Sequence, residues 1–94
     1  MKIGLLIIYF ELPGMTSLKQ KRSRIKPLLA RLHKEFNVSS AEIEALDAWN
    51  KSIIACALVS NDGAFCQRAL QEVLGFVEHN WPDLLILEHH IELV

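Results

Sequence analysis

Runs of apolar residues mark four stretches of the chain as strands. Residues 2–10 and 52–59 are apolar at nearly every position, which is typical of central strands covered on both sides. Residues 38–46 alternate between apolar and polar side chains, which predicts a strand with one face in solvent. Residues 84–94 alternate in a similar way and form the last predicted strand.

The stretch Ser17–Phe36 is a predicted amphipathic helix. Its apolar side chains recur at helical spacing and form a stripe that faces a core: Leu18, Ile25, Leu29, Leu32 and Phe36. Ser17 fits the N-cap, and Gln20 three residues later completes a capping box. Pro27 removes one backbone hydrogen bond and crowds the preceding turn, so we expect a kink near residues 23–26 or a helix in two segments.

A second helix follows the strand at residues 52–59. Residues 60–63, Ser-Asn-Asp-Gly, are typical of a strand exit and a helix N-cap, and the helical pattern continues to about His79. The resulting order, β-α-β-β-α-β, predicts an α+β fold, the ferredoxin-like plait, with a four-stranded antiparallel sheet and both helices on one face. In that plait the first and third strands are central, which agrees with the two apolar runs. No linker or repeat interrupts residues 1–94, so we expect a single domain.

Charge is distributed unevenly along the chain, although the formal net charge is only −1. Residues 1–35 carry eight basic and two acidic residues, whereas residues 36–94 carry two basic and nine acidic ones. The predicted first helix alone holds seven of the ten basic residues and a single acid, Glu35. Such a local excess predicts contact with the phosphates of RNA or DNA, and the alternative is an ordinary solvated helix face.

We expect the phosphate contacts to come from five residues of this helix. They are Lys19, Lys21, Arg22, Lys26 and Arg31. On a helical wheel Lys19, Arg22 and Lys26 lie on one flank of the apolar stripe, whereas the other flank holds Lys21, Arg24 and Arg31. The first flank is favoured because it begins at the helix N-terminus, where free backbone N–H groups add to an anion site. The expected function is that of a small non-enzymatic protein associated with RNA or the ribosome.

The sheet face that no helix covers is predicted to be apolar, because both central strands carry apolar residues on both sides. A large exposed apolar patch usually marks an interface, so the alternative function is a homo-oligomerising interaction or ligand-sensing module, most simply a dimer. Long side chains such as Tyr9 or Glu42 offer another explanation, since they could shield this face. Base stacking as in an RNA-recognition motif is disfavoured because residues 52–59 contain no aromatic side chain.

The acidic and histidine side chains of the strands form no recognisable catalytic or metal-binding motif. Glu88, His90 and Glu92 share a face of the last strand, and Glu42 and Glu44 share a face of the second. Both arrangements are usual for solvated strand faces, so no metal site and no cofactor are predicted. The chain lacks a glycine-rich phosphate loop and a nucleophile elbow, so we expect it not to be an enzyme.

The cysteines and the N-terminal residues bear on the compartment of the protein. Cys56 and Cys66 stand ten residues apart and form no CxxC pair, so both are interpreted as reduced thiols of a cytoplasmic protein. The apolar run that ends at Glu11 is too short for a membrane span and lacks a signal-peptide cleavage site, so no membrane association is expected. In the predicted turn, Trp49 could anchor a partner, although a tryptophan that closes one end of the core is commoner.

Several short motifs, taken in order, resemble a known family. They are Ser17-Leu18-Lys19-x-Lys21-Arg22, Phe36-Asn37-Val38-Ser39 with Glu42, Asp47-x-Trp49, and Val59-Ser60-Asn61-Asp62. Together they are similar to the YlxP-like family of small bacterial proteins of unknown function, over essentially the whole chain. The resemblance implies a ferredoxin-like fold and a cytoplasmic protein whose gene, in some bacteria, lies among genes for translation initiation and ribosome maturation. It implies no catalytic residues, and Pro27 departs from the family pattern, in which this helix is free of proline.

Overall fold

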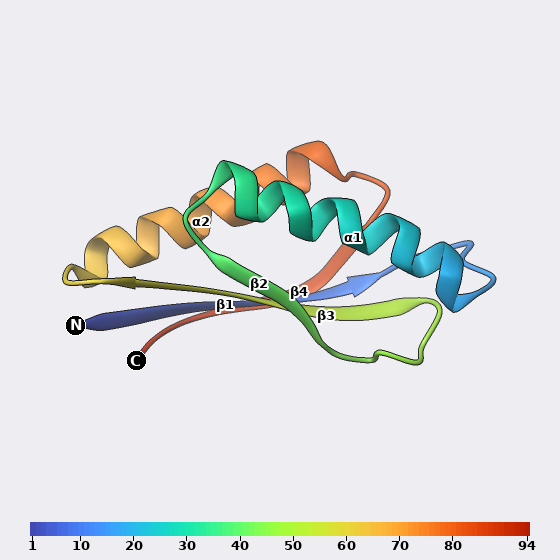
Figure 1. Cartoon of the computed structure of the whole chain (residues 1–94), viewed down its shortest axis with the longest axis horizontal. Coiled ribbons are helices and arrows are strands. Elements are labelled where there is room, and N and C mark those ends of the chain that lie inside the picture. Colours follow the sequence, from blue (N-terminus) through green and yellow to red (C-terminus); the bar gives the residue numbers. More distant parts are fainter.

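The structure, a computed structural model, describes all residues 1–94 and contains one sheet and two helices (Figure 1). The elements are the strands β1 (Lys2–Glu11), β2 (Ser39–Glu44), β3 (Lys51–Ser60) and β4 (Leu85–Leu93), and the helices α1 (Leu18–Glu35) and α2 (Gly63–Asn80). The strands are antiparallel in the order β2-β3-β1-β4, and Figure 1 shows both helices over the same face of the sheet. The ferredoxin-like α+β plait expected from the element order is therefore confirmed, with β1 and β3 in the centre.

The core lies between the helices and one face of the sheet. Every second residue in the middle of β1 and β3 points toward the helices and is buried: Leu6, Ile8, Phe10, Ile54, Cys56 and Leu58. The helices cover this layer with Ile25, Leu28 and Leu32 from α1 and with Cys66, Leu70, Val73 and Val77 from α2. Removing these apolar side chains from water is the main favourable term in folding, at about 25 cal/mol per Å².

Helix α1 begins at the N-cap Ser17 in a variant of the capping box, in which Gln20 binds the N–H of Thr16 rather than that of Ser17. The Ser17 hydroxyl accepts a hydrogen bond from the Gln20 N–H at 3.1 Å, while the Gln20 side-chain carbonyl accepts one from the Thr16 N–H at 2.7 Å. The helix then runs without a break through Pro27, so the prediction of two segments is wrong. Pro27 and Ser23 both lie on the exposed side of α1, where water can bind the Ser23 carbonyl that the proline leaves without a donor.

Two local irregularities change which strand residues face the helices. The β2–β3 register shifts between Glu42 and Glu44, so that Glu42 lies opposite Ile54 on the helix side and Glu44 lies on the opposite face. The prediction that both glutamates share a solvated face is therefore wrong, because the bulge at Ile43 interrupts the alternation. A similar shift in the β1–β4 pairing leaves Leu87 exposed.

Both cysteines are buried and unpaired. This confirms the expectation of free thiols at Cys56 and Cys66. Burial raises the pKa of the Cys56 thiol from 9.0 to about 12, so this thiol carries no charge at neutral pH. Neither helix has the length and apolar character that a membrane crossing requires.

Candidate nucleic-acid interface

Six of the seven basic side chains of α1 fall into three groups that differ in their surroundings, and the seventh, Lys34, is exposed near the C-terminal end of the helix. The first group is Lys21 alone, whose side chain is 0% exposed. It lies in the inward row of the helix with Ile25, Leu28 and Leu32. A buried ammonium group cannot reach the phosphates of a nucleic acid, so the prediction that Lys21 is a phosphate-binding residue is wrong.

The Lys21 ammonium is held by the connection between β2 and β3. Its Nζ donates hydrogen bonds to the backbone carbonyls of Ala45, Ala48 and Lys51 at 2.6, 2.7 and 2.8 Å. All three N–H donors of the ammonium group therefore have acceptors. Ala45 has a φ of 60°, a left-handed conformation that costs energy for a residue with a side chain. Its carbonyl is one of the three that bind Lys21, so the ammonium helps to hold the connection in this conformation.

Glu42 supplies the negative charge that balances Lys21. Its Oε2 lies 2.8 Å from Lys21 Nζ and also accepts a hydrogen bond from the Ser52 hydroxyl at 2.7 Å. The Glu42 side chain is 14% exposed, so both charges of the pair are largely removed from water. Buried charges are tolerated when they are paired and hydrogen-bonded, and this pair meets both conditions. The pair connects α1 to β2 and β3.

The periodicity of α1 contains a signal for the burial of Lys21. Lys21, Ile25, Leu28 and Leu32 follow one another at intervals of four, three and four residues, which is the spacing of one helix face. The predicted apolar stripe included Leu29 in place of Leu28, and Leu29 is only partly buried. A lysine in line with three apolar residues, rather than beside them, is the feature that indicates burial here.

The second group, Arg24 and Arg31, is engaged with other parts of the chain. Arg24 forms an ion pair with Asp83 in the connection between α2 and β4. The Arg31 guanidinium lies 3.5 Å from Glu35 Oε1, and its central carbon is 5.4 Å from the centroid of the Phe76 ring. At this distance the cation is attracted to the face of the ring. The predicted contact Arg31 therefore lies on the α2 side of the helix, where its charge already has partners.

The third group consists of Lys19, Arg22 and Lys26. All three are exposed and form no ion pair within the chain. They line one shallow surface depression together with Ser23 and Pro27. The sequence placed these three bases on one flank of α1, and the structure confirms that they lie together. We call Lys19, Arg22 and Lys26 the basic flank.

The first turn of α1 adds backbone donors next to Lys19. The N–H groups of Leu18 and Lys19 form no hydrogen bond within the chain, whereas the N–H of Gln20 is capped by Ser17. Free N–H groups and the positive end of the helix dipole both favour an anion at this position. The basic flank and the helix N-terminus thus present donors and positive charge on adjoining surface.

The polar side chains of the sheet form no metal site. No group of three histidine, cysteine, aspartate or glutamate side chains converges so that it could hold a metal ion. Glu88 and His90 face the same side, as expected: His90 Nε2 lies 3.1 Å from Glu88 Oε1, and the imidazole packs edge-on against Tyr9. Trp49 is 52% exposed in the β2–β3 connection, and its role as a partner anchor stays a prediction.

Comparison with known proteins identifies the family. A family model described as "Protein of unknown function (DUF503)" matches residues 3–91. The chain therefore belongs to DUF503, a family of unknown function. It is similar to "Uncharacterized protein YlxP" of Bacillus subtilis (strain 168), with 37% identity over 68 residues that cover 72% of this chain and 73% of the relative. The resemblance to the YlxP-like family that the sequence motifs indicated is thus confirmed.

Proposed function

We propose that the protein is a small non-enzymatic RNA- or ribosome-associated protein that contacts phosphates through the basic flank. The observation that carries the proposal is that Lys19, Arg22 and Lys26 share one depression and have no acidic partner, whereas Lys21, Arg24 and Arg31 are paired. Exposed and unpaired cations can bind phosphates and release their counterions, which drives association with nucleic acids. The acidic remainder of the chain would orient the molecule with α1 toward the polyanion.

The proposed contacts predict how affinity depends on salt. Phosphate contacts from a single helix carry no base readout, so binding should show little sequence preference. If each residue of the basic flank meets one phosphate of a single strand, the logarithm of the affinity falls by about 2 for each unit of log salt concentration. A slope of this size would support contact by the flank rather than by the whole surface.

Changing Lys19, Arg22 and Lys26 together to glutamate is expected to abolish binding to ribosomal RNA at low salt. Each phosphate contact then becomes a repulsion, while the fold is retained because all three side chains are exposed. Binding is measured by mobility shift with an RNA fragment and by sedimentation with ribosomal subunits at two salt concentrations. Circular dichroism of the variant verifies that the helices persist.

The matched control reverses Lys2, Lys34 and Lys51, three exposed lysines that lie outside the depression. It changes the net charge of the protein by the same amount and is expected to retain most of the affinity. An equal loss in both triple variants would mean that only the overall charge matters. Absence of any binding by the wild-type protein at low salt would refute the proposed function.

We further propose that the protein has no catalytic activity and resides in the cytoplasm. Strongly displaced pKa values tend to cluster at catalytic sites, but the raised pKa of the Cys56 thiol does not mark such a site. The cause is burial in the core, which keeps the thiol neutral and away from solvent. The free state of Cys56 and Cys66 supports a reducing compartment.

A second candidate function is self-association through the sheet face that no helix covers. The side chains of β1 and β3 that point to this face are almost all apolar: Ile3, Leu5, Ile7, Tyr9, Ile53, Ala55, Ala57 and Val59. They are neighbours across the two central strands, so they form a continuous surface. Such a surface fits a second copy of the same sheet related by a two-fold axis.

Replacing Leu5 by aspartate is expected to shift the protein from dimer to monomer, because the change puts a charge in the centre of the open face. Leu87→Asp is the control, since Leu87 is 57% exposed on β4 and outside the two central strands. Ala57→Lys tests the same face with a longer side chain, in case Leu5→Asp prevents folding. The size is measured by sedimentation velocity, and a wild-type protein that is monomeric at high concentration would eliminate this candidate.

A further inference from the structure

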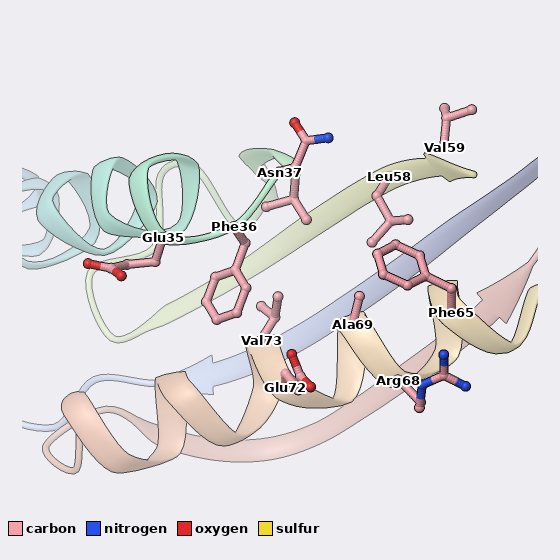
Figure 2. A pocket seen from close by; sticks show the side chains of 11 residues that line it. Glu35, Phe36, Asn37, Leu58, Val59, Phe65, Arg68, Ala69, Glu72 and Val73 are labelled. Carbon is pink, nitrogen blue, oxygen red and sulfur yellow. The ribbon is translucent and has the colours of Figure 1, made fainter. Parts of the chain in front are cut away.

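A cavity of 360 Å³ opens between the C-terminal end of α1, the end of β3 and the first half of α2 (Figure 2). Apolar side chains dominate its lining and include Phe36, Val38, Leu58, Phe65 and Val73. Its volume lies near the lower end of the range for small-molecule sites, about 300–1,000 Å³. The cavity is therefore suited to a small metabolite.

The Phe65 ring, which lines the cavity, is open to water. Phe65 is 49% exposed. Figure 2 shows the Phe36 and Phe65 rings standing apart, with Ala69 and Val73 of α2 between them. An apolar group placed between the two rings would remove this surface from water, which favours its binding.

The charged lining residues of α2 have no partner within the chain. Arg68 and Glu72 both line the cavity and lie four residues apart on α2, yet neither forms an ion pair with any residue. Residues at this spacing are neighbours on a helix surface, with Cβ atoms about 5–6 Å apart. Glu35, the third charged lining residue, is instead paired with Arg31 at 3.5 Å. Adjacent unpaired charges of opposite sign match a ligand that carries both signs.

We propose that this cavity binds an apolar L-α-amino acid, of the leucine or phenylalanine type. Arg68 binds the carboxylate, Glu72 binds the ammonium group, and the apolar side chain lies between Phe36 and Phe65. The two charged groups of an amino acid are joined through a single carbon, so two side chains one helical turn apart can contact both. A phosphorylated ligand is disfavoured, because Arg68 is the only basic residue of the lining and Glu72 places a negative charge beside it.

The amino-acid site is separate from the basic flank. The cavity lies at the C-terminal end of α1, whereas the basic flank lies in its N-terminal half. The 18 residues of α1 extend over about 27 Å at the usual rise per residue. Binding of an amino acid can therefore be tested without any assumption about RNA.

The test is a titration of the ¹⁵N-labelled protein, followed by its amide NMR spectrum, with L-leucine and L-phenylalanine. Both are expected to shift the signals of residues around the cavity, from Phe36 to Val38 and from Phe65 to Val73. Two probes each lack one charged group of leucine: 4-methylpentanoate has no ammonium group, and 3-methylbutylamine has no carboxylate. Each probe is expected to bind at least about tenfold more weakly than leucine, because one charge-assisted contact is lost.

Variants assign the two contacts. Arg68→Gln and Glu72→Gln should each weaken leucine binding about tenfold, and both residues are exposed, so the fold is retained. Arg68→Gln should leave 3-methylbutylamine unaffected, whereas Glu72→Gln should leave 4-methylpentanoate unaffected. Glu78→Gln is the control, since Glu78 is exposed on α2 but does not line the cavity. The proposal is overturned if neither amino acid shifts the spectrum, if 4-methylpentanoate binds as tightly as leucine, or if both variants bind leucine like the wild type.

Discussion

Lys21→Met is expected to lower the free energy of unfolding by about 3–5 kcal/mol, because it removes one partner of a buried ion pair. Methionine keeps much of the volume of lysine but leaves Glu42 and the carbonyls of Ala45, Ala48 and Lys51 without their donor. In a domain of this size, such a loss lowers the melting temperature by more than about 10 °C. Urea and thermal unfolding followed by circular dichroism measure the effect.

Two further variants test whether the loss of stability comes from the buried charge of Lys21. Lys34→Met makes the same substitution at an exposed site of α1 and should change stability by no more than about 0.5 kcal/mol. Adding Glu42→Gln to Lys21→Met should recover part of the loss, because the neutral amide no longer leaves an unpaired charge in the interior. A Lys21→Met protein as stable as the wild type would contradict the assigned role of the buried pair.

Gly4→Val is expected to destabilise the protein by about 1–3 kcal/mol through overpacking. Gly4 lies on the helix-facing side of β1, where α2 passes close to the strand. A Cβ atom added there would lie 3.0 Å from Leu70 Cδ1 and 3.1 Å from Cys66 Cβ. Both neighbours belong to the buried face of α2, so the helix must move for the larger side chain to fit.

The control for Gly4 is a glycine that no side chain approaches. Gly75 lies in the interior of α2, and a Cβ atom added there has no neighbour within 4 Å. Gly75→Ala should stabilise the protein by about 0.4–1 kcal/mol, because alanine restricts the unfolded chain and favours the helix. Gly4→Val should therefore lower the free energy of unfolding and Gly75→Ala should raise it in the same assay. If both substitutions changed this free energy in the same direction, the packing argument for Gly4 would be rejected.

The order of the elements could be predicted from the sequence because their patterns are long and regular. The continuous apolar runs of β1 and β3 indicated central strands, and the capping box at Ser17 marked the start of α1. The face of Glu42 could not be predicted from alternation, because the bulge beside it depends on pairing with β3. The expectation of two helical segments at Pro27 was wrong, since the backbone group that the proline leaves unpaired lies in solvent.

The sequence predicted some residues of the candidate site correctly. The residues that it predicted wrongly are those whose side chains contact residues far along the chain. Charge and spacing were enough to group Lys19, Arg22 and Lys26 on one flank of α1. The same charge count included Lys21 and Arg31, but the acceptors of Lys21 lie on the β2–β3 connection, and Arg31 packs against α2. The composition of a helix gives the number of its charges, whereas the tertiary structure decides which of these charges can contact a phosphate.

The buried ammonium of Lys21 also bears on the order of events during folding. Its carbonyl partners lie 24 to 30 residues further along the chain, so it can lose its water without penalty only after α1, β2 and β3 have met. A hairpin that pairs in a shifted register would leave the ammonium dehydrated and without these acceptors. Docking of α1 and selection of the β2–β3 register are therefore one cooperative step. In this step the charge of Lys21 disfavours pairing of the two strands in a shifted register.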